Sequence, residues 1–121
     1  MEKDMLKEIF RLQSKFDQAV VAHRGLDFTK EVWIQKEILA IISELSEILD
    51  EVNFKWWKDP QELDQDRLKE EIVDLLHFFV SMCLKAEIGP EELYQAYLEK
   101  NKENFARQKG KTDRPGYAWN K

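Results

Sequence analysis

Residues 38–49 form a largely apolar segment with the sequence Ile38-Leu39-Ala40-Ile41-Ile42-Ser43-Glu44-Leu45-Ser46-Glu47-Ile48-Leu49. Its apolar residues recur every three or four positions, which predicts the buried face of an α-helix. Glu44 and Glu47 interrupt the apolar run at a spacing of three, which places both acids on one side of that helix. Acidic residues are rarely buried unless they are paired or bind a metal. The stretch therefore predicts a helix that carries a binding site as well as part of a core.

A second acidic pair follows later in the sequence. Glu71 and Asp74 are also three residues apart, and they run into the mostly apolar residues 75–80. Like charges at this spacing repel one another, so an isolated helix gains nothing from them. Four carboxylates from two packed helices form an oxygen-rich cage for a hard divalent cation such as Mg²⁺. We therefore predict that metal is bound by Glu44, Glu47, Glu71 and Asp74.

The apolar periodicity and the chain breaks predict four helices. We expect them over about residues 3–24, 30–52, 65–87 and 91–109. Gly25 ends the first helix in a left-handed conformation, and Gly89-Pro90 ends the third helix and begins the fourth. Short connections between the helices predict an all-α, antiparallel, bundle-like four-helix domain over residues 1–121. Residues 110–121 form an irregular tail in this prediction, either a lid over an anionic ligand or a frayed end.

The first two helices each carry a predicted apolar face. In the first helix the residues expected to be buried are Met5, Ile9, Leu12, Phe16 and Ala19. A neighbouring stripe contains Gln13 and Asp17, which lie either at the water-facing edge of the core or in a polar pocket. In the second helix the core seam is Ile34, Ile38, Ile41, Leu45, Ile48 and Val52. Glu37 and Glu51 lie on another face of the second helix, which we predict to be solvated.

The third predicted helix is apolar over most of its surface. Its main stripe consists of Leu68, Ile72, Leu75, Phe79, Met82 and Ala86. Such a helix is expected to be central and covered on several sides, more than a lone four-helix domain of this size requires. We therefore predict that two copies of the chain form a homodimer or a higher homo-oligomer. His77, beside Phe78 on this helix, is either a satisfied structural residue or part of a pocket.

Two further segments combine aromatic or amide side chains with cations. The segment Phe54-Lys55-Trp56-Trp57-Lys58 joins the second and third helices. Either one Trp covers the end of the core, or a ring stacks on a base while a lysine holds phosphate oxygens. In the fourth helix, Lys100, Asn104 and Arg107 share a face. Asn is a poor helix former, so Asn101 and Asn104 indicate either a binding function or an exposed polar face.

Composition narrows the class of protein. The chain has 121 residues, of which 43% are hydrophobic and 36% charged, as in a helical domain with charged outer faces. No apolar run approaches the roughly 18 residues of a membrane span, and no secretory signal opens the chain. The lone Cys83 excludes a disulfide framework and favours a reducing cytoplasm. A net charge of −5 argues against a nucleic-acid partner.

Several motifs occur together and in a fixed order along the chain. They are Leu12-Gln13-x-x-Phe16, Glu44-x-x-Glu47, Phe54-Lys55-Trp56-Trp57-Lys58, Glu71-x-x-Asp74-x-x-His77-Phe78 and Lys100-Asn101-x-x-Asn104-x-x-Arg107-Gln108. Together they resemble the dimeric dUTPase branch of the MazG-like all-α nucleoside triphosphate pyrophosphohydrolases. The resemblance extends over nearly the whole chain up to Gln108.

The resemblance implies hydrolysis of dUTP to dUMP and diphosphate with Mg²⁺, with two or more ions in each site. The four acids then hold the metal, and Glu44, with Glu47 as the next candidate, activates water. The residues implied to form the uracil pocket are Gln13, Trp57, His77 and Phe78. Those implied to hold the sugar or the phosphates are Lys58, Lys100, Asn101, Asn104 and Arg107.

The chain departs from the resembled branch at Asp17. The branch has an Asn at this position, four residues after the Gln of the first helix. An Asp accepts hydrogen bonds but donates none unless it is protonated. We expect Asp17 to contact the substrate. Because Asp17 lacks the donor of an Asn, hydrolysis of dCTP or of a broader range of nucleotides is an alternative to dUTP hydrolysis. An alternative of another class is a non-catalytic helical dimerisation module whose acids are merely solvated.

Overall fold

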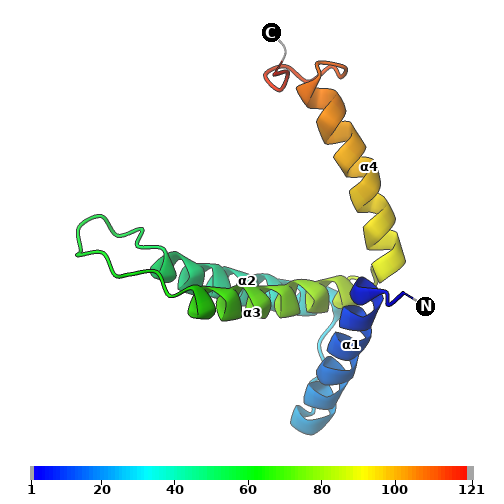
Figure 1. Cartoon of the computed structure of the whole chain (residues 1–121). Coiled ribbons are helices and arrows are strands. Elements are labelled where there is room, and N and C mark those ends of the chain that lie inside the picture. Colours follow the sequence, from blue (N-terminus) through cyan, green and yellow to red (C-terminus); the bar gives the residue numbers. More distant parts are fainter. Residues whose placement is uncertain (1, 120–121) are drawn as a thin grey trace. The chain divides into compact units, whose positions relative to one another are not determined.

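A computed structural model describes residues 2–119 of the chain, and all regular structure among them is helical. The helices are α1 (Met5–Arg24), α2 (Lys30–Glu51), α3 (Gln65–Lys85) and α4 (Pro90–Gln108) (Figure 1). The predicted all-α class with four helices is confirmed. The chain divides into two compact units between Ile88 and Gly89, so that α1, α2 and α3 belong to the first unit and α4 to the second. The single domain over residues 1–121 stays a prediction.

Side-chain caps explain where the first three helices begin. Asp4 accepts a hydrogen bond from the backbone N–H of Lys7 at 3.1 Å, and Asp64 caps α3 in the same way. Thr29 caps α2 through its hydroxyl oxygen. These side chains satisfy backbone donors that have no partner within a helix. Gly25 ends α1 as predicted, because its φ of 60° lies in the left-handed region that favours glycine.

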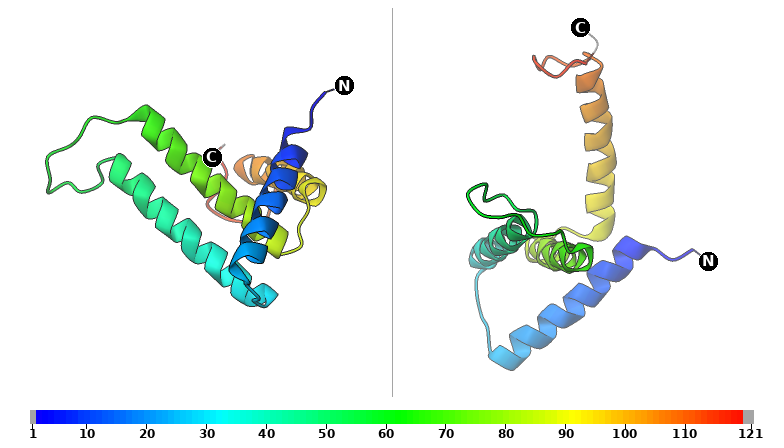
Figure 2. Two further views of the ribbon diagram at one scale, coloured as in Figure 1. Left: turned by 90° about the horizontal axis from the view of Figure 1, so that it is seen from below. Right: turned by 60° about the vertical axis from the view of Figure 1, so that its left-hand side comes forward.

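The first unit is built on the pair α2 and α3, which lie side by side in Figures 1 and 2. Helix α1 crosses α3, with Gln13 opposite His77 and Asp17 opposite Ser81. The buried apolar side chains among the described residues are Phe10, Val80 and Cys83. Phe10 belongs to α1, and Val80 and Cys83 belong to α3.

The predicted buried face of α1 is wrong. Met5, Leu12 and Phe16 are exposed, whereas Phe10 and Gln13 of the neighbouring stripe are buried. The neighbouring stripe faces α3 because Gln13 finds a hydrogen-bond partner there. The predicted seam of α2 is likewise only partly covered, since several of its members have exposed side chains, namely Ile38, Leu45 and Val52. Much apolar surface of the first unit is therefore left uncovered within that unit.

The segment between α2 and α3 is closed by Asn53. The Asn53 side-chain amide donates to the Gln61 carbonyl at 2.7 Å and its oxygen accepts from the Gln61 N–H at 2.8 Å. Neither Trp of the segment is buried, since Trp56 is 86% and Trp57 is 60% exposed. The alternative in which one Trp covers the end of the core is therefore wrong.

The second unit consists of α4 and the irregular tail that follows it. Residues of the tail fold back on the end of α4, because the Trp119 N–H donates to the Gln108 carbonyl at 2.7 Å. The Trp119 ring also meets Phe105 edge to face at 6.3 Å. The tail is thus docked on its own helix up to Trp119, and a role as a lid stays a prediction. No helix of the described residues is long and apolar enough to cross a membrane.

Candidate functional site

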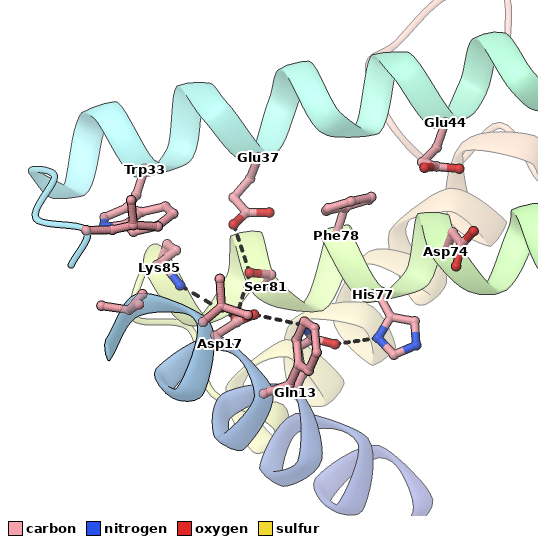
Figure 3. Close-up of a pocket in the computed structure, with 14 residues that line it drawn as sticks. Gln13, Asp17, Trp33, Glu37, Glu44, Asp74, His77, Phe78, Ser81 and Lys85 are labelled. Carbon is pink, nitrogen blue, oxygen red and sulfur yellow. Dashed lines mark hydrogen bonds and ion pairs between the residues drawn. The ribbon is translucent and has the colours of Figure 1, made fainter. Parts of the chain in front are cut away.

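A cavity of about 530 Å³ lies between the three helices of the first unit. Figure 3 shows Trp33, Glu37 and Glu44 of α2 on one side and Asp74 and Phe78 of α3 on the other. Helix α1 closes the cavity from below with Gln13 and Asp17. Acidic groups lie at one end of the cavity, and a hydrogen-bonded network lies at the other.

The acidic end brings together three of the four predicted metal ligands. Glu44, Glu47 and Glu71 each place a carboxylate oxygen within 4.8 Å of the others. Asp74 lies beside this acid cluster, close enough for its charge to act on Glu44. Helices α2 and α3 position these side chains because each pair is three residues apart and faces the opposing helix. The prediction that Asp74 is itself a ligand stays a prediction.

Proximity and burial raise the proton affinity of this cluster. Hydrogen bonding to Glu47, followed by burial and the charges of Glu47 and Glu44, raises the pKa of Glu71 to about 7. Burial first, and then the charges of Glu47 and Asp74, raise the pKa of Glu44 above its ordinary value. Such shifts are expected where like charges share a site without a cation between them.

The acid cluster fits a hard divalent cation. Glu44 Oε2 is buried and has no hydrogen-bond partner among the described residues. Buried carboxylate oxygens without a partner are costly, and a cation supplies the partner that the protein does not. Carboxylate oxygens are the ligands that Mg²⁺ and Ca²⁺ prefer. Glu44, Glu47 and Glu71 would therefore hold such an ion, with Asp74 next to it.

At the other end of the cavity, polar side chains of three helices form hydrogen bonds with one another. Asp17 accepts from Gln13 Nε2 at 2.8 Å through one oxygen and from the Ser81 hydroxyl at 2.7 Å through the other. Ser81 Oγ also lies 2.8 Å from Glu37 Oε1. Gln13 Oε1 accepts from His77 Nδ1 at 2.6 Å, because an amide oxygen can only accept. These five residues form one continuous chain, which we call the pocket network.

The wall beside the pocket network is aromatic and carries a single lysine. The Lys85 ammonium lies 4.5 Å from the centre of the Trp33 ring and 3.5 Å from Asp17 Oδ2. The Trp33 ring also meets Phe28 edge to face at 5.0 Å. Together with Phe78, Trp33 gives the cavity the flat apolar surfaces on which a ring-shaped ligand packs.

Comparison with known proteins identifies the family to which this cavity-bearing chain belongs. A family model described as dUTPase matches residues 5–92, well over half of the chain. The chain belongs to this dUTPase family. The match contains every residue of the acid cluster and of the pocket network.

The dUTPase-family chain also matches two curated phage proteins. The dCTP pyrophosphatase of Enterobacteria phage LZ5 is 34% identical over 74 residues, which cover 61% of this chain and 43% of that protein. The dCTP pyrophosphatase of Enterobacteria phage T4 is 33% identical over 87 residues, 60% of this chain and 51% of that protein. The chain spans about half the length of these relatives. No solved structure matches it.

The structure brings some of the predicted substrate residues of this dUTPase-family chain together and leaves others apart. Gln13, Asp17, His77 and Phe78 all line the cavity. Trp57 and Lys58 do not line it; Lys58 lines a separate small hollow of the segment between α2 and α3. The predicted roles of Trp57 and Lys58 in substrate binding stay predictions.

The remaining predicted residues belong to the second unit. Both cations already have an acidic partner there, because Lys100 lies 3.3 Å from a Glu103 oxygen and Arg107 pairs with the same side chain. Hydrogen bonding from Lys100, followed by the charge of Arg107, lowers the pKa of Glu103. Asn104 Oδ1 accepts from Arg107 at 3.3 Å, and Asn101 is exposed. Their predicted contacts with sugar or phosphate stay predictions.

The sequence did not predict four residues that bring polar groups to the cavity, namely Trp33, Glu37, Ser81 and Lys85. The prediction that Glu37 lies on a solvated face is wrong, since only 8% of Glu37 is exposed. A signal was present, because Glu37 lies seven residues before Glu44 and therefore two turns away on the same face of α2. Glu51 is also largely covered, with a side chain that is 17% exposed and an ion pair to Arg67 at 3.0 Å.

Proposed function

We propose that the chain is a divalent-metal-dependent nucleoside triphosphate pyrophosphohydrolase acting on pyrimidine deoxynucleotides. The reaction is dNTP + H₂O → dNMP + diphosphate. One observation carries the proposal, namely that three carboxylates of α2 and α3 converge within 4.8 Å at the end of a partly aromatic cavity. Membership of the dUTPase family supports the reaction class.

Mg²⁺ is the proposed cofactor, with two or more ions in each site. Its ligands would be Glu44, Glu47, Glu71 and Asp74, and the ion supplies charge neutralisation of phosphate oxygens and a more acidic bound water. Glu44 is the proposed proton acceptor. Its Oε2 atom has no hydrogen-bond partner among the residues described. If one Glu44 oxygen holds the ion, the other can take a proton from water. Glu47, whose side chain is exposed, is the next candidate.

The cavity is the proposed site for the base. Trp33 and Phe78 offer flat apolar surfaces, and Gln13 and Asp17 offer fixed polar atoms from α1. The acid cluster lies at the other end of the cavity, since Glu44 lines both. A nucleotide bound along the cavity therefore has its base at the pocket network and its phosphates at the acids.

Two substrates are supported by separate findings. dUTP is the substrate implied by the family resemblance and by the dUTPase family model, and dCTP is the substrate in the printed names of both phage relatives. The exposed apolar faces of α1 and α2 also support the expectation that copies of the chain associate.

The proposal is tested with a panel of nucleoside triphosphates incubated with the protein and Mg²⁺. We expect diphosphate and dNMP from dUTP or dCTP and little turnover of dTTP or purine nucleotides. Glu47→Ala and Asp74→Ala should abolish the reaction. If no nucleotide is hydrolysed, and Mg²⁺ binding is the same in both variants as in the wild type, the non-catalytic helical module is the better description.

A further inference from the structure

At the centre of the pocket network, the Ser81 hydroxyl lies between two carboxyl groups. Ser81 Oγ lies 2.7 Å from Asp17 Oδ2 and 2.8 Å from Glu37 Oε1. A serine hydroxyl has one hydrogen to donate, and an ionised carboxylate can only accept. Ser81 can therefore satisfy one of the two carboxylates and not both. A second hydrogen bond at this distance requires that one of the two carboxyl groups carries a proton.

The surroundings assign that proton to Glu37. Asp17 has the Lys85 ammonium 3.5 Å from Oδ2 and accepts from Gln13 at its other oxygen, both of which favour an ionised group. Glu37 is buried on the other side of Ser81. Burial, with a smaller contribution from the charge of Asp17, raises the pKa of Glu37, whereas the Ser81 hydrogen bond and Lys85 act in the opposite direction. Glu37 then donates from Oε1 to Ser81, and Ser81 donates to Asp17.

This assignment defines what Glu37 offers to a ligand. Its second oxygen points away from Ser81 along the cavity, toward Phe78 (Figure 3). With the proton on the oxygen beside Ser81, the second oxygen is a carbonyl-type acceptor. If Glu37 loses the proton, the same oxygen is still an acceptor. Glu37 therefore presents an acceptor to the cavity in both states.

The other polar atoms at this end of the cavity add few free donors. Both Asp17 oxygens accept within the network, and Lys85 is held by Asp17 and by the face of Trp33. The Gln13 amide uses its oxygen for His77 and one N–H for Asp17. Because hydrogen-bond acceptors outnumber free donors at this end of the cavity, a base whose edge carries N–H donors is favoured. Cytosine brings two N–H bonds in its amino group, where uracil brings a carbonyl oxygen.

We propose that Glu37 is the specificity-determining residue of this cavity and that its free oxygen accepts a hydrogen bond from the amino group of a cytosine ring. The inference rests on the proposed function, because it takes the cavity to be the site of the base. Asp17 is a positioning residue in this arrangement, since it acts through Ser81 and does not contact the amino group. Uracil in the same place sets a carbonyl oxygen against the Glu37 oxygen. That contact leaves two buried acceptors unpaired. We therefore expect a preference for dCTP over dUTP of about tenfold or more.

The first experiment measures kcat/KM for dCTP and dUTP with Mg²⁺ in the wild type, Glu37→Ala and Glu37→Gln. We expect the wild type to favour dCTP by about tenfold or more and Glu37→Ala to lose most of that preference. Glu37→Gln should retain it, because an amide can donate to Ser81 and keep a carbonyl oxygen toward the cavity. Glu31→Gln is the matched control, since Glu31 is exposed on the same helix, and its ratio should equal that of the wild type.

The second experiment separates this inference from the proposed function. Calorimetry with dCMP and dUMP measures base recognition without hydrolysis. Preferential dCMP binding that is lost in Glu37→Ala supports the role of Glu37 even if no triphosphate is hydrolysed. A wild type that favours the uracil nucleotides in either assay, that binds neither monophosphate, or whose preference is unchanged in Glu37→Ala overturns the inference. The ratio of kcat/KM for dCTP and dUTP in the wild type tests the inference even if a variant fails to fold.

Discussion

The two ends of the cavity hold their acidic side chains in opposite ways. At the pocket network, Asp17 and Glu37 are matched by a hydroxyl and an ammonium group of α3 and by an amide of α1. At the acid cluster, carboxylates face carboxylates, and Glu44 Oε2 is buried without a partner among residues 2–119. The carboxylates of the pocket network are therefore matched by groups of the protein, whereas the acid cluster keeps a buried carboxylate oxygen that no described residue matches.

The two arrangements of acids differ in what they contribute to stability. A satisfied network is rigid and contributes to stability as well as to ligand recognition. An unsatisfied cluster of like charges costs stability until its ligand arrives. The two ends should consequently respond in opposite directions to the removal of one carboxylate.

The largest expected effect is on hydrolysis at the acid cluster. Glu44→Gln keeps the size of the side chain but removes its proton-accepting carboxylate. We expect kcat to fall by at least about 100-fold, measured as diphosphate release with the preferred nucleotide and Mg²⁺. Glu31→Gln, on the exposed side of the same helix, should leave kcat unchanged. An active Glu44→Gln enzyme would remove Glu44 from the role of proton acceptor.

Metal binding should stabilise the wild type. At a Mg²⁺ concentration about 100 times its Kd, a cation that binds only the folded chain adds about 2.7 kcal/mol to the free energy of unfolding. The gain should vanish when Mg²⁺ is removed with a chelator, and it should be reduced in Glu47→Gln. In the chelator, Glu47→Gln should be as stable as the wild type or more so, because the repulsion within the cluster is weakened. Thermal unfolding monitored by circular dichroism measures both.

Removal of a carboxylate from the pocket network should have the opposite effect. Asp17→Asn loses the ion pair with Lys85 and replaces one acceptor by a donor facing Gln13 or Ser81. We expect the free energy of unfolding to fall by about 1–3 kcal/mol, with or without Mg²⁺. Urea denaturation provides the measurement. A variant as stable as the wild type would contradict the view that the carboxylates of this end are matched by groups of the protein.

The shared proton should give the pocket network a distinct pH dependence. Burial raises the pKa of Glu37 above its ordinary value of 4.5, so the folded chain holds this proton more tightly than the unfolded chain. The resulting stabilisation is fully present below pH 4.5 and is lost as the pH rises through the folded pKa. Glu37→Gln carries no such proton. The stability of the wild type relative to Glu37→Gln should therefore fall as the pH rises, in urea denaturation at several pH values.

The smallest effect is expected from an ion pair that is satisfied but more exposed. Arg67 contacts Glu51 at 3.0 Å, and the Arg67 side chain is 66% exposed. Arg67→Ala should lower the free energy of unfolding by less than about 1 kcal/mol, with hydrolysis unchanged. A loss as large as that of Asp17→Asn would mean that charge pairing, rather than burial of the network, distinguishes the two ends of the cavity.

Local patterns were sufficient for the helices and for the acid cluster. The caps at Thr29 and Asp64 and the break at Gly25 are short-range features, which explains why the predicted helix ends agree closely with the structure. The spacing of Glu44 and Glu47 was enough to place them on one face of α2. Periodicity could not show which of two apolar stripes of α1 is buried, because that depends on the helix it meets. The stripe that contains Gln13 is the buried one, since α3 offers Gln13 a hydrogen-bond partner.

The all-α class, the helix limits and the acidic pairs follow from local sequence, because helix periodicity and capping are properties of neighbouring residues. The burial of Glu37 beside Ser81 and the partners of Asp17 on α1 and α3 depend on how the helices pack. The physical reason is that the partner of a buried polar atom lies on another helix, as far as 64 residues away for Asp17 and Ser81. The spacing of three was enough to place Glu44 beside Glu47. That Glu44 Oε2 is buried without a hydrogen-bond partner among the described residues depends on the packing of α3 against α2.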